Sequence, residues 1–139
     1  MSHFQTATDL FHACESLKGW EGCKEFVADE AVFTAQCEPL TEITTVQEYC
    51  EWMAGVGNGP LKGCSYKLHS SSYDEQGQTA LFFATFTATH VGDGGPVEPT
   101  QKQTNSDYVY ALTMNEEGKV EKMCKIWNAP WALKELGWG

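Results

Sequence analysis

One stretch, residues 105–127, constrains the fold of this chain more than any other. Residues 115–118, Asn-Glu-Glu-Gly, form a turn sequence in which Gly118 occupies a position that needs a positive φ. Side chains alternate on both sides of the turn, so the stretch predicts two β-strands joined by a tight hairpin. In the first strand Asp107 heads a face of small side chains that continues with Val109, Ala111 and Thr113. We expect this face to point into the protein, where a carboxylate requires a functional explanation.

The length and charge of the chain limit what it can be. Its 139 residues, 42% of them hydrophobic, suffice for one domain (residues 1–139) with one core. The net charge is −10 and every basic residue is a lysine, which argues against nucleic-acid binding. The N-terminus lacks a basic and then apolar leader, and no apolar run approaches ~18 residues, so we expect a cytoplasmic protein without membrane association.

The cysteines are spread along the chain without the spacing of a zinc site. Small, apolar thiols of this kind usually pack in a protein core. We therefore expect six free thiols, no bound metal and no cofactor. The cysteines are Cys14, Cys23, Cys37, Cys50, Cys64 and Cys124.

Helical periodicity is concentrated in the first half of the chain. Apolar residues at helical spacing predict helices over residues 5–18, 20–27 and 45–57. The pairs Ser2/Gln5 and Thr45/Glu48 have the spacing of capping boxes at the start of the first and third helices. A short strand, residues 31–36, is expected between the second and third helices.

From residue 64 onward the pattern is that of strands. Residues 64–73, 78–90 and the hairpin predict four long antiparallel strands in meander order, followed by a short helix over residues 128–137. In the second of these strands one face alternates small side chains with Phe82, Phe86 and His90. Helices first and a long sheet afterwards indicate an α+β fold, in which a curved antiparallel sheet wraps around three N-terminal helices and leaves a cone-shaped cavity for an apolar small molecule.

Three sequence passages carry a resemblance to a known family: FVADEAVF, NEEGKVEKMCKIW and ALKELGW. Together with the order of elements, they resemble the nuclear transport factor 2-like superfamily, and within it the SnoaL-like polyketide cyclases and the ketosteroid isomerases. The resemblance implies a cystatin-like α+β cone. Asp107, 11 residues before Gly118, matches a cavity carboxyl of these families, and Trp127, nine residues after Gly118, matches a pocket aromatic residue of the isomerases.

Other positions depart from the isomerase pattern. The tyrosine that binds the oxyanion in isomerases falls on Phe11, which has no hydroxyl. The isomerase base falls on Ala35, unless an insertion moves it to Glu38. Steroid isomerisation by that mechanism is therefore not expected.

Asp107 and His90 are the predicted catalytic pair. If the loop between their strands is a simple hairpin, the two side chains lie across from each other, as a histidine and an aspartate do in SnoaL-like cyclases. A carboxyl in an apolar cavity and a nearby imidazole could exchange a proton near neutral pH. The alternative is an Asp107 that bonds to loop amides or to Asn105, with His90 in solvent.

Further residues are candidates for contact with a ligand. His69 shares the cavity face only if it lies opposite Phe82, whereas a bulge at Gly77 turns it outward. Glu38 could replace the missing base, or could simply be an exposed loop residue. The remaining candidates are Trp127, Phe86, Phe82 and Tyr49. Packing in the core explains Tyr49 equally well.

The function that this pattern favours is general acid/base chemistry, without a cofactor, on an apolar carbonyl compound. The reaction would be that of a cyclase, isomerase, dehydratase or other lyase. The alternative is a non-catalytic binding or scaffold domain of the same fold. We also expect a homodimer through the outer sheet face, formed by Thr85, Thr87 and Thr89 with Tyr108, Tyr110, Leu112 and Met114.

Overall fold

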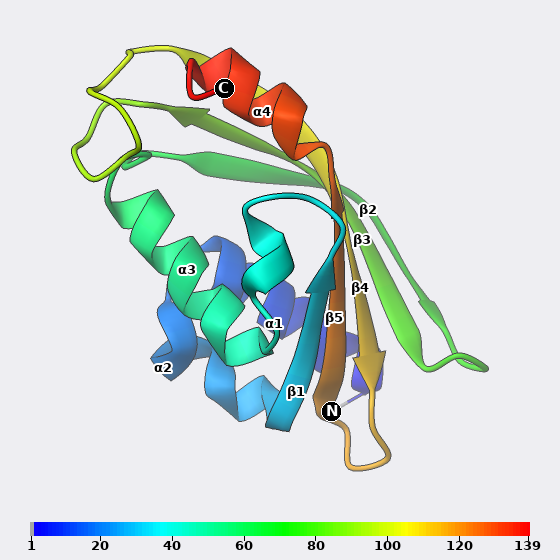
Figure 1. Cartoon of the computed structure of the whole chain (residues 1–139). Helices are drawn as coiled ribbons and strands as arrows, with labels where there is room; N and C mark the ends of the chain where they lie inside the picture. The colour runs from blue at the N-terminus through cyan, green and yellow to red at the C-terminus, as the bar shows by residue number, and fades with distance from the viewer. Residues whose placement is uncertain (1) are drawn as a thin grey trace.

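A computed structural model describes residues 2–139. A five-stranded sheet bends over three helices, and a fourth helix lies at the end of the sheet opposite the hairpin turn (Figure 1). The helices are α1 (His3–Glu15), α2 (Gly19–Cys23), α3 (Val46–Asn58) and α4 (Ala129–Leu136). The strands are β1 (Val27–Ala35), β2 (Ser65–Asp74), β3 (Thr79–Thr89), β4 (Gln103–Met114) and β5 (Val120–Trp127). Short 3₁₀ turns cover Lys24–Phe26 and Leu40–Glu42.

The strand order in the sheet is β1-β5-β4-β3-β2. The last four strands in sequence, β2 to β5, are antiparallel as predicted. The first strand is the exception, because β1 pairs with β5 in parallel, with Phe33 opposite Met123 and Ala35 opposite Lys125. The sheet is therefore mixed and open, and the predicted α+β architecture is confirmed.

Local capping explains where the helices begin. The Ser2 side chain accepts a hydrogen bond from the Gln5 amide at 3.0 Å, and Thr45 and Glu48 form a complete capping box. At α4 the Asn128 side chain accepts from the Trp131 amide. All three helix starts lie within two residues of their predicted positions. None of the helices in residues 2–139 is long and apolar enough to cross a membrane.

The register between β3 and β4 corrects one prediction. Thr85 pairs with Asp107, and Ala84 pairs with Tyr108, so the even-numbered residues of β4 face the helices. Tyr108 and Tyr110 are buried, whereas Asp107 is exposed on the opposite face. The predicted facing of β4 was wrong because the even-numbered side chains are the larger ones, and burying them removes more apolar area from water.

Candidate functional site

A cavity of about 450 Å³ lies between the inner face of the sheet, α3, α4 and the loop around residues 94–96. Most of its wall is apolar. The side chains that form this wall include Trp52, Met53, Val56, Phe86, Trp127, Leu133, Leu136 and Trp138. The volume and the aromatic lining suit a small, ring-containing organic molecule.

Three side chains with acid/base chemistry lie on the wall of this cavity: Glu15 from the end of α1, Tyr108 from β4 and Lys125 from β5. Glu15 is 3% exposed and Lys125 is 6% exposed. Charged side chains are rarely buried to this extent unless they have partners, so their contacts define what the site can do.

A chain of hydrogen bonds joins these groups through two further tyrosines. The Tyr110 hydroxyl donates to Glu15 Oε2 at 2.7 Å, and the Tyr108 hydroxyl donates to Glu15 Oε1. The hydroxyls of Tyr49 and Tyr110 are bonded to each other, and Lys125 Nζ donates to Tyr49 Oη at 2.9 Å. Tyr49 and Tyr110 are fully buried and lie behind the wall of the cavity.

The direction of each hydrogen bond in this chain follows from counting hydrogens. A tyrosine hydroxyl carries one hydrogen, and that of Tyr110 is donated to Glu15. Tyr110 therefore accepts from Tyr49, and Tyr49 accepts from Lys125. Every hydrogen points away from Lys125 and toward Glu15, which is the arrangement of an ammonium at one end and a carboxylate at the other.

Burial brings the proton affinities of Glu15 and Lys125, at the two ends of this series of hydrogen bonds, closer together. Burial raises the pKa of Glu15, although the charge of Lys125 and the hydrogen bonds from Tyr108 and Tyr110 oppose the rise. Burial lowers the pKa of Lys125 to about 8, although the charge of Glu15 opposes the fall. The charged pair and the neutral pair are therefore separated by less free energy than they would be in water.

Aromatic rings enclose the Lys125 ammonium on several sides. Nζ lies 4.3 Å from the ring centroid of Trp127, 5.2 Å from that of Tyr49 and 5.4 Å from that of Tyr108. Ring faces stabilise a cation through their quadrupole and also exclude water. These contacts hold a charged amine in an apolar cavity with a single hydrogen-bond acceptor, Tyr49.

Three of the predicted ligand contacts lie on the cavity wall: Trp127, Phe86 and Glu38. Glu38 is exposed and sits where the cavity adjoins a second, shallower hollow on the outside of the sheet. Phe82 is instead part of the core, where its ring stacks on Phe11 with centroids 5.0 Å apart. Trp127, Phe86 and Glu38 therefore line the cavity, whereas Phe82 does not.

Asp107 and His69 do not reach the cavity. Thr85 Oγ1 donates to the Asp107 carboxylate at 2.6 Å, and His69 Nε2 lies 2.7 Å from the same Thr85 oxygen. All three side chains stand on the outer face of the sheet. A bulge between Leu68 and Ser70, rather than at Gly77, accompanies the outward position of His69. The prediction that Asp107 is buried and faces the interior was wrong.

His90 is buried but is not paired with Asp107. Its Nδ1 accepts hydrogen bonds from Trp138 Nε1 at 2.8 Å and from the Thr100 amide at 3.3 Å. Its backbone pairs with Lys102, five residues from Asp107, which corresponds to a separation of roughly 16 Å along the strand. The imidazole packs against the Trp138 ring and fastens the C-terminal segment to the loop that follows β3.

Sequence reasoning missed the two charged residues that matter most in this cavity. Glu15 follows Phe11 by four positions and therefore shares the buried stripe of the first helix. Lys125 alternates with Met123 and Trp127, whose side chains face inward. A lone charge within an otherwise apolar stripe was the signal in both cases.

Residues 2–139 contain no group of three histidine, cysteine, aspartate or glutamate side chains arranged to hold a metal ion. All six cysteines are free thiols, as predicted.

Comparison with known proteins identifies the fold. No protein-family model and no curated protein matches the sequence. A candidate SnoaL-like polyketide cyclase from Jannaschia sp. CCS1 superposes with a TM-score of 0.76 at 14% identity, covering 96% of this chain and 90% of that one. IdmH, a candidate polyketide cyclase from Streptomyces antibioticus, gives a TM-score of 0.75 at 15% identity over 99% of both chains.

Epoxide hydrolases also share the architecture. An LEH-like epoxide hydrolase from M. tuberculosis has a TM-score of 0.66 at 13% identity, covering 96% of this chain and 88% of that one. At these identities the comparison establishes the fold alone. The chain has the nuclear transport factor 2-like cone fold of the SnoaL-like proteins, and the predicted resemblance is confirmed at that level.

Proposed function

We propose that this chain is a cofactor-free enzyme that binds an apolar carbonyl compound in the cavity and catalyses a proton transfer next to the carbonyl group. The observation that carries the proposal is the buried carboxylate of Glu15, which opens on an aromatic cavity together with Tyr108 and Lys125. The cyclase and epoxide hydrolase neighbours support an enzymatic use of this fold.

Each polar group on the wall has a role in such a reaction. Glu15 is the general base, because burial raises its pKa and each of its oxygens keeps a free lone pair beside the tyrosine bond. Lys125 donates one hydrogen to Tyr49 and can donate another to the substrate oxygen, where negative charge develops as the proton leaves carbon, while the hydrogen bond from Tyr108 orients the Glu15 carboxylate. The resulting enolate can close a ring, shift a double bond or expel a leaving group.

The aromatic wall supplies the remaining part of the mechanism. Trp127, Phe86 and Trp52 offer flat apolar surfaces that orient a ring-containing substrate. Excluding water also strengthens the electrostatic stabilisation of the enolate by Lys125.

The exchange of α-protons for deuterium tests the proposal directly. We expect the protein to accelerate exchange in 2-tetralone, an apolar bicyclic ketone, as followed by proton NMR in D₂O. Glu15→Gln keeps the volume of the side chain but cannot accept the proton as a base, so the rate should fall by ~100-fold or more. Asp107→Asn, on the outer face, is the matched control and should leave the rate unchanged. An equal loss in both variants, or a wild-type rate no higher than that of buffer, contradicts the proposal.

A non-catalytic binding domain is the second candidate. It is favoured by the way the polar groups satisfy one another, since Glu15, Lys125 and the tyrosines form a closed network without a ligand. In that case 2-tetralone binds with the same affinity to wild-type protein and to Glu15→Gln, and neither accelerates exchange.

We also propose that two copies associate through the outer face of the sheet and that the protein is cytoplasmic. Large apolar side chains stand exposed on that face, with Phe83 42% and Ile126 62% accessible to solvent. This composition differs from the predicted one, because Tyr108, Tyr110, Leu112 and Met114 are buried on the inner face. The six free thiols support a reducing compartment.

A further inference from the structure

Lys125 differs from every other lysine in the chain. The eight others, Lys18, Lys24, Lys62, Lys67, Lys102, Lys119, Lys122 and Lys134, are all exposed. Lys125 is 6% exposed and opens on the cavity. An amine in such a place meets apolar molecules rather than water, so its chemistry is set by what the cavity admits.

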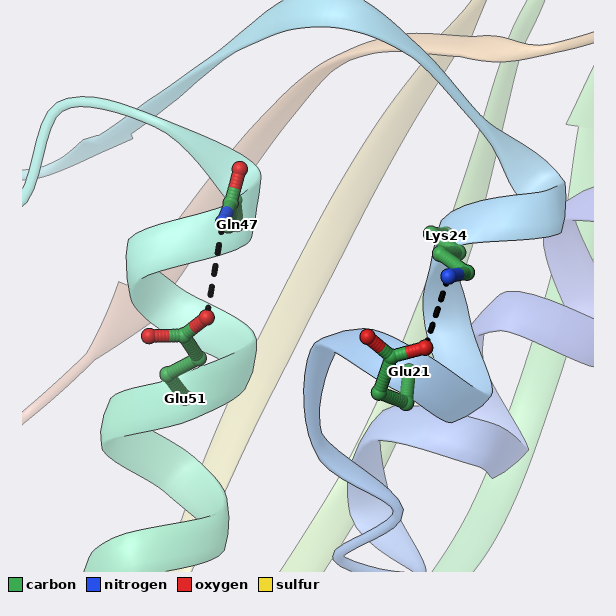
Figure 2. A network of polar contacts seen from close by, with 4 residues as sticks. All are labelled: Glu21, Lys24, Gln47 and Glu51. Atoms are coloured by element: carbon green, nitrogen blue, oxygen red, sulfur yellow. Dashed lines mark hydrogen bonds and ion pairs between the residues drawn. The ribbon is translucent and has the colours of Figure 1, made fainter.

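The contacts of Lys125 hold the amine without neutralising it directly. Its hydrogen-bond acceptor is the Tyr49 hydroxyl, and the Trp127 ring lies beside it. Among residues 2–139 the one ion pair is Lys24–Glu21, 2.6 Å apart on the surface, which Figure 2 shows next to the Gln47–Glu51 contact of α3. No carboxylate is therefore close enough to Nζ to fix its proton, and the nitrogen can become a nucleophile.

The tyrosine chain gives the proton of Lys125 a destination. A proton can move from Nζ to Tyr49 while the Tyr49 hydrogen moves to Tyr110 and the Tyr110 hydrogen moves to Glu15. The outcome is a neutral amine and a neutral carboxyl group. Burial favours both, because it lowers the pKa of Lys125 and raises that of Glu15.

We propose that Lys125 forms an imine with an aldehyde or ketone bound in the cavity, so that the substrate class of the site is an apolar carbonyl compound with an accessible carbonyl carbon. This inference rests on the proposed function, because it takes the same cavity as the binding site. It adds a covalent role for one residue of the wall.

The reaction needs no further reactant. The nitrogen lone pair attacks the carbonyl carbon, a C–N bond forms, and the π electrons of the C=O bond move to oxygen. This oxygen takes a proton from the Tyr108 hydroxyl, which recovers one from the carboxyl group of Glu15. The nitrogen then passes its one extra proton through the Tyr108 hydroxyl to the new hydroxyl group, and the nitrogen lone pair forms the C=N bond as that group leaves as water. Hydrolysis reverses each step and restores the amine.

Reductive trapping tests the proposal on the whole chain. The protein is incubated with 2-naphthaldehyde and sodium cyanoborohydride at pH 8, and the product is followed by intact mass and peptide mapping. We expect one fast addition per chain, with the mass of the aldehyde less one oxygen, located on Lys125. The exposed lysines should react at least ~10-fold more slowly, because no cavity holds the aldehyde beside them.

Two comparisons make the result specific to the cavity. 2-Naphthylmethanol has the same ring system and no carbonyl group, so it should compete with the aldehyde and protect Lys125 from labelling in a saturable manner. Lys125→Met should lose the fast addition, while Lys122→Met, an exposed lysine on the same strand, should retain it. The position of the label in the unaltered chain decides the question even if a variant folds poorly.

The outcomes separate this inference from the proposed function. Labelling spread evenly over the exposed lysines overturns the imine. If the wild-type chain accelerates α-proton exchange and the label is absent from Lys125, the imine is wrong and the proton-transfer function stands. If neither labelling nor exchange depends on the cavity, both the imine and the proton-transfer function are wrong.

Discussion

The two faces of β4 carry two hydrogen-bonded networks that use similar side chains in opposite surroundings. On the inner face Glu15 and Lys125 are joined through tyrosine hydroxyls and are almost completely buried. On the outer face Asp107 and His69 meet at the Thr85 hydroxyl and are exposed to solvent. Water screens the outer network, whereas the inner one interacts at low dielectric, where charges affect each other strongly. The chemistry of a carboxylate in this fold therefore depends on the side of the sheet on which it lies.

The largest expected difference between the networks is in stability. Glu15→Ala leaves two buried tyrosine hydroxyls without their acceptor and the buried charge of Lys125 without an opposite charge, and should lower the free energy of unfolding by about 3–5 kcal/mol. Asp107→Ala removes an exposed acceptor and should cost less than about 1 kcal/mol. Urea denaturation at pH 7 measures both. Equal losses would show that the inner network is no more strongly coupled than the outer one.

The second difference is in the response to pH. Lys125 has a pKa of about 8 in the folded chain and an ordinary value of 10.5 when unfolded. The unfolded chain therefore binds more protons between these values, and stability rises with pH across that window. At about 1.4 kcal/mol per pH unit, the free energy of unfolding of the wild type should rise by about 3 kcal/mol relative to that of Lys125→Met between pH 8 and pH 10.5.

Urea denaturation at several pH values checks this prediction. Lys122→Met is the matched control, because Lys122 is exposed on the same strand. Its difference from wild type should not change with pH. A constant difference for Lys125→Met as well would mean that the buried ammonium is as well solvated as a surface one.

The smallest effect on the folding of one chain is expected on the outer apolar face. Phe83→Glu places a charge where the side chain is already 42% exposed, so chain stability should change by less than about 1 kcal/mol. The same charge would be buried if two copies meet there, and the homodimer should dissociate. Sedimentation at micromolar concentration distinguishes the species. A wild-type chain that sediments at 15.4 kDa removes the homodimer proposal.

Local signals in the sequence were enough for the elements of the fold. The turn at Gly118, with its φ of 81°, and the capping pairs at Ser2 and Thr45 each act over a few residues, so they can be recognised without knowing the rest of the molecule. The alternation of Phe82 and Phe86 also gave the inner face of β3 correctly. The parallel pairing of β1 with β5 has no comparable local signal, since it joins residues about 90 positions apart.

The site was harder to predict because it depends on which face of the sheet each side chain occupies. The long connection between β3 and β4 does not determine which residues pair across the two strands, and a shift of one residue exchanges the faces. Asp107 was placed inside on the strength of a family spacing, although Tyr108 and Tyr110 present more apolar surface for burial. Glu15 and Lys125 come from opposite ends of the chain and meet only in three dimensions.

The single direction of the tyrosine hydrogen bonds has a consequence for repeated turnover. Once a proton has passed from Lys125 to Glu15, the Tyr49 and Tyr110 hydroxyls point back toward the amine, and a second passage in the same sense requires both to rotate. A reaction that returns the proton along the same path resets the hydroxyls without any rotation. The site therefore favours cycles whose net proton count is zero, such as isomerisation or the formation and hydrolysis of an imine, over reactions that export a proton at each turnover.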